Sequence, residues 1–350
     1  MRNQQLIFAR EYRGYTQSEL SSMIPGLSQS NLSKFEKGLG TLSEDLVGRI
    51  MKTLDFPMTF LELKIEAADN GHYRRKATIK ASQRGQIKRF ISLVSYMVDI
   101  MAEDIEFPDF KFSYLDVESG ISPQEAARIT RQKLKLGANP ARDIFQLLEA
   151  NGVIVYQWDC DIKEFDGVSI LSDKGYHVVV LNMNMSNDRK RFTLAHELGH
   201  IIMHQSPEFI IVESRDKEQE AHDFASEFLM PEAAVRSYLS NLTIRELMSN
   251  KQYWLTSMAA LLKKAKSIGI VEANRYKNLV IELSRRGWRM NEPVDVYIDK
   301  PIVIDSAYSL LKNELLYSLS DIANTAYLPL DVVNRIFQAK QKHKIVFLQQ

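Results

Sequence analysis

The chain has 350 residues, which exceeds one average domain, so two or three compact units are expected, each with its own core. Hydrophobic residues make up 45% of it and charged residues 25%, and the formal net charge of +1 excludes a chain that is basic throughout, so any nucleic-acid contact must be local. The only cysteine, Cys160, excludes an internal disulfide framework and any metal site with several thiolate ligands.

The first residues, MRNQQLIFAREYRGYT, lack the apolar core of a signal peptide. No stretch reaches the uninterrupted apolar length that a membrane-spanning helix needs. We therefore expect a cytoplasmic protein with no membrane partner, and the single cysteine fits a reducing compartment.

Apolar residues recur at helical spacing through residues 3–66, with short polar turns at 13–16, 25–28 and 38–42. This pattern predicts four or five short helices and no strand. We assign residues 1–70 to an all-helical N-terminal domain.

Two helices of this domain carry clear start signals. Thr16 and Glu19 form a capping box that opens the helix QSELSSMI, and after a turn at Pro25-Gly26 the side chain of Ser28 caps the helix QSNLSKFEKG. This layout predicts a helix-turn-helix whose second helix enters the major groove of DNA. The side chains expected to contact base edges or the DNA backbone are those of Gln17, Gln29, Ser30, Asn31, Ser33 and Lys34.

A small helical bundle that binds protein, or that only dimerises, remains the alternative for these helices. Short helix pairs joined by glycine turns often have that role, and the modest basicity of the chain does not decide between the two.

Residues 71–118 are assigned to a connecting helical segment. The run GHYRRK at 71–76 predicts a hinge, and a helix follows until the turn-rich run FPDFKFSYLDVESG at 107–120. One face of this helix is apolar and predicts a packing or dimer surface, made of Ile87, Phe90, Ile91, Val94, Met97, Val98 and Met101.

Residues 119–293 are expected to form a second domain. Two helices come first, and then three runs rich in valine and isoleucine predict a small sheet: VIVYQ (153–157), VSIL (168–171) and VVVLN (178–182). The helix RFTLAHELGHIIMH follows, and the chain then becomes mainly helical again. The expected fold class is therefore α+β and mainly helical, with about three strands.

Residues 294–350 are assigned to a C-terminal helical extension. The run EPVDVYIDKPIVI is too interrupted by proline for a central strand, and further helices follow it. These helices either bind a partner or simply pack.

The run HELGH carries the strongest chemical signal. His196 and His200 are four residues apart, so both imidazoles project from one helix face, about 40° apart around the axis, and one metal ion can accept both. Zinc suits imidazole and carboxylate ligands, and a catalytic site leaves one position for water. Bound zinc lowers the pKa of that water to about 7, so Glu197 can take its proton and pass it to a leaving amine.

A chance match to this motif is the competing interpretation. The residues around it are largely apolar, which predicts a mostly buried helix, and two unliganded histidines would be costly to desolvate there. The composition of the helix therefore favours a metal site.

A third ligand has to come from another part of the chain. The extension with a further histidine six residues after the motif is excluded, because that position holds Ser206. A glutamate on the next helix is the other common solution, and Glu220 lies just before the apolar stripe of the segment 217–232. Glu218 and Glu213 are weaker candidates, since neither sits as close to that stripe.

Three further side chains are expected around the ligands. His204 and His222 are assigned supporting or packing roles, because one ion can use only some of the four neighbouring histidines. Asp223 can orient a ligating imidazole through its distal N–H, or it can lie at the surface.

These motifs resemble those of two families. The run TQSELSSMIPGLSQSNLSKFEKG resembles the phage-repressor-like (Xre-type) helix-turn-helix family, with a slightly lengthened turn. Between residues 120 and 290 the chain looks like the ImmA/IrrE-type metallopeptidases, on the runs LGANP, FDG, LN, RKRFTLAHELGHIIMH, EAHDFASEFLMP and RRGWRMNEP.

The second resemblance implies zinc bound by His196, His200 and Glu220, with Glu197 as the catalytic base. Position 222, where that family usually has asparagine, holds His222, which changes the surroundings of the ligands without removing one. Members of the family are implicated in cleaving repressors of mobile elements or stress regulons, so the resemblance implies a repressor-like protein substrate.

These signals together predict a regulatory zinc endopeptidase that its N-terminal domain holds at DNA, with a homodimer as one possible state. An exposed strand among residues 153–182 could take the substrate by strand addition. The alternative is a transcription regulator whose zinc domain senses metal or a ligand and cleaves nothing. Glu197 favours the enzyme, because a structural site needs no base. The DNA-binding domain disfavours a housekeeping peptidase.

Overall fold

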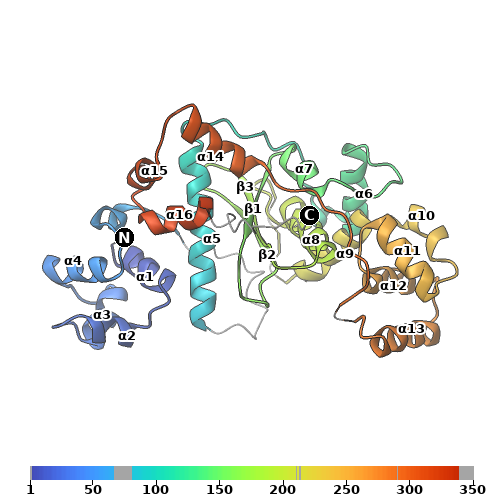
Figure 1. Cartoon of the computed structure of the whole chain (residues 1–350), viewed down its shortest axis with the longest axis horizontal. Helices are drawn as coiled ribbons and strands as arrows, with labels where there is room; N and C mark the ends of the chain where they lie inside the picture. Colours follow the sequence, from blue (N-terminus) through green and yellow to red (C-terminus); the bar gives the residue numbers. More distant parts are fainter. Residues whose placement is uncertain (1, 67–80, 210, 213, 290, 339–350) are drawn as a thin grey trace, which may run out of the picture. The chain divides into compact units, whose positions relative to one another are not determined.

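The computed structural model describes residues 2–66, 81–209, 211–212, 214–289 and 291–338 (Figure 1). The chain forms two compact units. The helical unit comprises Met1–Glu106, Ser172–Gly175 and Asp305–Gln350, and the sheet unit comprises Phe107–Leu171 and Tyr176–Ile304. The predicted hinge at 71–76 lies outside the described residues.

The helical unit begins with four short helices, as its periodicity predicts. They are α1 (Arg2–Tyr12), α2 (Gln17–Met23), α3 (Gln29–Glu36) and α4 (Glu44–Thr53), followed by a 3-10 turn, η1 (Met58–Glu62). The side chains of Thr16, Ser28 and Ser43 each accept a hydrogen bond from a main-chain N–H of the first helical turn. Such caps satisfy N–H groups that have no partner within the helix, so the boundaries of α2, α3 and α4 are set locally.

The long helix α5 (Ala81–Met101) belongs to the core of the helical unit. Its predicted apolar face is fully buried. It packs on α1, where Arg89 forms an ion pair with Glu11 at 3.0 Å and lies over the ring of Phe8. The helix ends at Met101, a short distance before the turn-rich run at 107–120 predicted to end it, and Pro108 within that run cannot continue a helix.

Three C-terminal helices complete the helical unit: α14 (Val303–Asn313), α15 (Leu319–Thr325) and α16 (Leu330–Gln338). Asp331 of α16 forms an ion pair with Arg13 at 2.5 Å, and Arg335 lies over the ring of Phe90. The hydroxyl of Tyr96 donates to the carbonyl of Ala326. These contacts join residues more than 200 positions apart, so the C-terminal helices pack with the N-terminal ones.

The sheet unit contains three strands, β1 (Val153–Trp158), β2 (Gly167–Leu171) and β3 (His177–Asn182), in the order β1-β3-β2. β1 runs parallel to β3, and β2 runs antiparallel to it, with Ser169 opposite Val179. The expected α+β, mainly helical fold with a small sheet is therefore confirmed. β2 stands at an edge of the sheet because its one strand neighbour is β3.

Helices surround this sheet and fill the rest of the unit. They are α6 (Pro123–Lys133), α7 (Ile144–Glu149), α8 (Asn187–His204), α9 (Lys217–Leu229), α10 (Glu232–Val235), α11 (Ile244–Trp254), α12 (Met258–Ser267) and α13 (Ala273–Arg285), with 3-10 turns η3 (Val117–Ser119) and η4 (Ser237–Leu239). No helix within the described ranges combines the length and apolar character needed to cross a membrane.

Close packing between α8 and α9 positions the HELGH motif. α8 also contacts β2 and β3, and most of its side chains from Arg191 onward are buried. Gly199 faces Phe224 of α9 so closely that a Cβ atom there would lie 3.0 to 3.2 Å from three atoms of that side chain. The glycine within the motif therefore permits the short distance between the two helices.

Candidate metal centre

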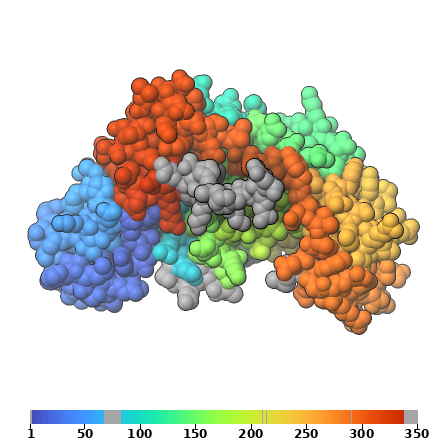
Figure 2. Space-filling model, in the orientation of Figure 1, coloured from blue at the N-terminus to red at the C-terminus, as the bar shows by residue number. Residues whose placement is uncertain are grey.

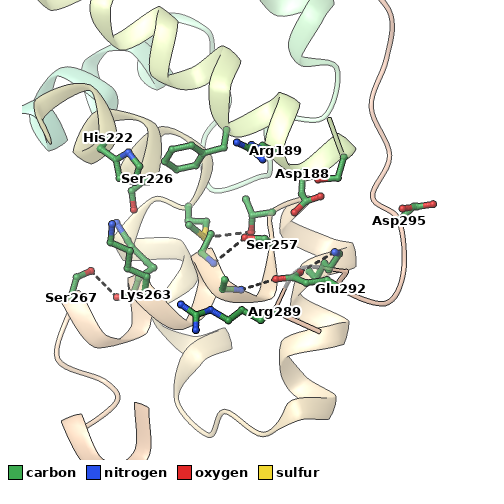
Figure 3. A pocket seen from close by; sticks show the side chains of 18 of the residues that line it. Asp188, Arg189, His222, Ser226, Ser257, Lys263, Ser267, Arg289, Glu292 and Asp295 are labelled. Carbon is green, nitrogen blue, oxygen red and sulfur yellow. Dashed lines mark hydrogen bonds and ion pairs between the residues drawn. The ribbon is translucent and has the colours of Figure 1, made fainter. Parts of the chain in front are cut away.

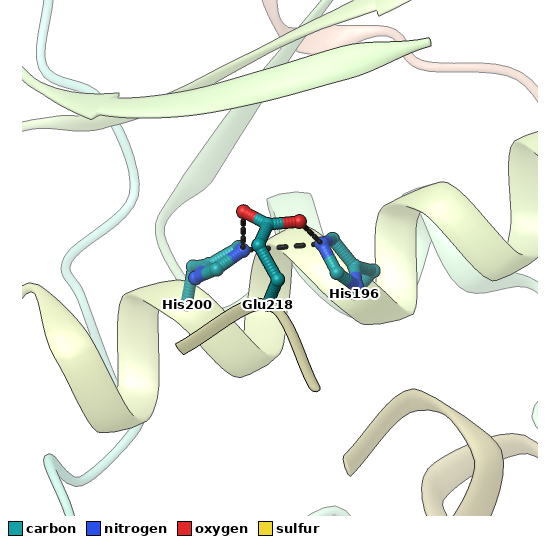
Figure 4. Close-up of side chains that lie close together, drawn as sticks. All are labelled: His196, His200 and Glu218. Carbon is teal, nitrogen blue, oxygen red and sulfur yellow. Dashed lines mark hydrogen bonds and ion pairs between the residues drawn. The ribbon is translucent and has the colours of Figure 1, made fainter. Parts of the chain in front are cut away.

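His196 and His200 project from the same face of α8 (Figure 4). Their Nε2 atoms are 3.1 Å apart, and the side chain of His200 is 1% exposed. The spacing of four residues produces this arrangement, because each residue advances about 100° around the helix axis. Two imidazole nitrogens thus meet at one point.

Glu218 brings a carboxylate to that point from the first turn of α9 (Figure 4). Its Oε2 atom lies 3.6 Å from His196 Nε2, and its Oε1 atom lies 3.5 Å from His200 Nε2. One donor atom from each of the three residues lies within 4.8 Å of the others. Two imidazoles and one carboxylate are the donor set of a catalytic zinc site with an open coordination position, so these residues fit such an ion.

Glu220 lies elsewhere, in contrast to the expectation that it supplies the third donor. Its Oε2 atom is 2.9 Å from His204 Nε2, and Arg215 donates to its Oε1 atom at 2.9 Å. Two residues along a helix rotate a side chain by about 200°, so Glu218 and Glu220 face nearly opposite directions. Glu218 lies three residues before Ala221 and seven before Ala225, so helical spacing places it on the same side of α9 as the apolar stripe, and Glu220 lies further from that side. Glu213 is outside the described residues.

The three supporting residues occupy different places. His204 lies behind His200, with their Nδ1 atoms 3.0 Å apart. The ring of His222 packs on that of His196, with centroids 5.9 Å apart, and burial, then the cation of Lys263, lower the pKa of His222. Asp223 accepts a hydrogen bond from Gln219 at 2.8 Å.

Glu197 is held by the edge strand of the sheet. Both the main-chain N–H and the hydroxyl of Ser169 donate to its Oε2 atom, each at 2.7 Å. Gln205, just after α8, donates to the carbonyl and the hydroxyl of Ser169 from the same side chain. Sequence reasoning missed both residues. The one available signal was a serine within an otherwise apolar strand, VSIL, which predicts a buried hydroxyl that needs partners.

A cavity of about 750 Å³ lies beside α8 and α9, and among its lining residues is His222, whose ring packs on that of His196 (Figure 3). Phe192 and His222 form part of its wall, and their rings are 4.7 Å apart. Most of its lining comes from α8, α9, α12 and residues 289 and 291–295, and it includes both cations and carboxylates, among them Lys263 and Asp188. This volume suits a small molecule or several side chains of a peptide.

The predicted DNA-contact residues lie on α3 and at the start of α2. Gln29, Ser30, Asn31 and Lys34 are exposed, and Ser33 is half-buried. The N-terminal helices that include α3 form the blue surface in Figure 2. Gln17 accepts a hydrogen bond from Gln29 at 2.9 Å and donates to Glu36 at 2.6 Å. Glu36 in turn forms a buried ion pair with Arg10. The two glutamines are thus fixed against each other, and α3 presents a polar surface.

Comparison with known proteins places one part of the chain in a family context. Residues 157–266 match the family described as Peptidase M78, IrrE N-terminal-like domain. This range runs from the end of β1 to α12 and includes HELGH, Ser169 and Glu218. No curated protein was found to match the chain. This part of the sheet unit is therefore similar to the metallopeptidase-like domains of the ImmA/IrrE type.

Proposed function

We propose that this chain is a zinc peptidase with a regulatory role. The observation that carries the proposal is the convergence of His196, His200 and Glu218 next to Glu197, within the range that matches a peptidase family. A structural zinc site would close all four positions with protein ligands and would need no neighbouring carboxylate. Here three donors converge, and the acidic residue that follows the first histidine is available as a base.

In this proposal His196, His200 and Glu218 would hold a zinc ion, and the ion would supply Lewis-acid chemistry that activates a carbonyl and lowers the pKa of a water molecule. The carboxylate of Glu197 would accept the proton of the attacking water and pass it to the nitrogen of the leaving amine. Ser169 directs this carboxylate with two hydrogen bonds, which reduces the number of orientations it can adopt.

The substrate in this proposal is an extended peptide that pairs with β2. An edge strand offers main-chain groups for such pairing. At Ser169 these groups contact Glu197 and Gln205, so a peptide bound there would exchange with the two side chains. The neighbouring cavity would receive peptide side chains.

The regulatory part of the proposal rests on the helical unit. Its capped helices α2 and α3 present polar side chains suited to a major groove, so the chain acts at DNA and cleaves a repressor-like protein there. Cleavage would relieve repression of the genes that the repressor controls.

The direct test incubates the purified chain with candidate repressors encoded next to its gene. Wild type is compared with Glu197→Gln at equal zinc occupancy, so that only the base differs. We expect cleavage by wild type and a loss of at least about 100-fold in the variant, since proton transfer by a positioned side chain contributes about 10²- to 10⁴-fold. Equal cleavage by both proteins, or none by either with every partner, would remove the support for a peptidase.

A second candidate function is a regulator that binds a ligand and cleaves nothing. The cavity of about 750 Å³ favours this candidate, because its size is that of small-molecule sites. The experiment above separates the two, since only the peptidase requires Glu197.

A further inference from the structure

A chain of polar contacts extends behind His200, away from Glu218. The Nδ1 atoms of His200 and His204 are 3.0 Å apart, and His204 Nε2 is 2.9 Å from Glu220 Oε2. The other oxygen of Glu220 accepts a hydrogen bond from Arg215. Solvent has little access here, since the side chains of His200 and His204 are 1% and 0% exposed and that of Glu220 is 16% exposed.

Glu220 and Arg215, at the end of this series of contacts, determine which ring nitrogens carry protons. An ionised carboxylate can only accept hydrogen bonds, and Arg215 is a permanent donor beside it. Because Glu220 accepts, His204 has to carry a proton on Nε2. In its neutral form this imidazole has only that one proton, and its Nδ1 atom then presents a lone pair.

The same reasoning applies to the ring of His200. The lone pair on His204 Nδ1 requires a proton on His200 Nδ1, so Nε2 of His200 presents a lone pair. That atom is the one that lies 3.1 Å from His196 Nε2 and 3.5 Å from Glu218. The contact chain therefore selects the one tautomer of His200 that can bind a metal ion at the candidate centre.

We propose that Glu220 and His204 form a positioning pair that fixes the tautomer and the ring orientation of His200 for metal binding. The proposal rests on the metal centre of the proposed function and assigns Glu220 a place behind a ligand. Partners of this kind typically change metal affinity by about 10- to 100-fold. Arg215, which also contacts Glu118 at 3.4 Å, holds the carboxylate in place.

The test compares variants at three positions of α9. Glu218→Ala removes a proposed ligand, Glu220→Ala removes the positioning carboxylate, and Asp223→Asn is the matched control on the same helix, since Asp223 contacts Gln219. Zinc affinity is measured by competition with a chelator. The absorption spectrum of the cobalt-substituted protein reports the ligand set, and circular dichroism of the metal-free proteins checks the fold.

We expect Glu220→Ala to bind zinc about 10- to 100-fold more weakly than wild type while its cobalt spectrum keeps the wild-type form. Glu218→Ala should change that spectrum, and Asp223→Asn should match wild type. Glu220→Gln keeps an oxygen acceptor for His204, so its affinity should lie between those of wild type and the alanine variant.

Two results would overturn the positioning pair alone: wild-type zinc affinity in Glu220→Ala, or a cobalt spectrum that changes with Glu220→Ala and not with Glu218→Ala. The second result would make Glu220 the ligand. A wild-type chain that binds neither metal would overturn the proposed function, and the positioning pair with it.

Discussion

Buried polar side chains at the candidate centre each have a partner from a different element. Glu197 of α8 is hydrogen-bonded to Ser169 of β2, and His204 of α8 is hydrogen-bonded to Glu220 of α9. Burying a charged or polar group without such a partner costs several kcal/mol, so these contacts are required wherever the side chains are enclosed. At the scale of single residues, the site is therefore stabilised by hydrogen bonds between elements.

His177 on β3 shows the effect of burial on a titratable group outside the centre. Its ring is bonded to the hydroxyl of Tyr114 at 2.7 Å, and burial lowers its pKa to about 4. The unfolded chain binds a proton near pH 6.5, whereas the folded chain does so only near pH 4. Its contribution to stability is therefore complete above pH 6.5 and is lost as the pH falls towards 4.

We predict that this residue lowers the free energy of unfolding of the sheet unit by about 2 kcal/mol between pH 7 and pH 5. Urea unfolding can be followed by tryptophan fluorescence, since Trp158, Trp254 and Trp288 all lie in the sheet unit. The variant His177→Gln should lose this share of the pH dependence. The same pH dependence in variant and wild type would contradict the prediction.

At the scale of helices, the contact between α8 and α9 depends on Gly199, the smallest residue of HELGH. Gly199 lies against the side chain of Phe224, which brings α8 and α9 close enough for His196, His200 and Glu218 to meet. A larger residue would separate the helices and with them the three donors.

We predict that Gly199→Ala lowers the free energy of unfolding by about 1–3 kcal/mol, because the added Cβ overpacks the interface. It should also weaken zinc binding. Gly48→Ala is the control, since Gly48 lies within α4 and its Cβ would meet nothing within 4 Å; that variant should be stabilised by up to about 1 kcal/mol. Calorimetry of the two variants checks the signs, and a stabilised Gly199→Ala would contradict the packing argument.

The positions of several helices and strands could be predicted from local sequence patterns. The strands at 153–157, 168–171 and 178–182 and the caps at Thr16 and Ser28 agree with the structure to within two residues. Their boundaries depend on side chains and turns only a few positions away. α8 begins at Asn187, four residues before the predicted start, because polar residues fill its first turn and hide its periodicity.

For the whole molecule, the proposal separates two tasks between two units. DNA contact is assigned to α3 of the helical unit, and peptide hydrolysis to the sheet unit. The two tasks can therefore be removed independently by substitution.

We predict that the double substitution Asn31→Ala and Lys34→Ala weakens DNA binding in a gel shift and makes it less sensitive to salt, since one phosphate contact contributes about one to the slope. Lys52→Ala removes an exposed cation of α4 and serves as the control. Cleavage of a free peptide should be equal in all three proteins. Unchanged DNA binding in the double variant would favour a protein-interaction role for α2 and α3.

The division of the chain into two units depends on contacts between distant residues, which local sequence patterns do not indicate. Residues 305–338 and the N-terminal helices belong to one unit because Asp331 meets Arg13 and Tyr96 meets Ala326. In the sequence these helices follow the peptidase-like region, so from the sequence alone they are assigned to a separate C-terminal extension. Their partners lie more than 200 residues earlier, where periodicity carries no information about them.

The sequence by itself determined the fold class, the small sheet, the capped helix pair and the two histidines of HELGH. All of these depend on hydrogen bonds and side-chain spacing within a few residues, and the period of a helix places His196 beside His200 in any context. Only the tertiary structure decided that Glu218 faces these histidines, that Glu220 contacts His204 and that Ser169 holds Glu197. Those pairings depend on how α9 and β2 are rotated and placed against α8, and close packing of distant segments sets that rotation.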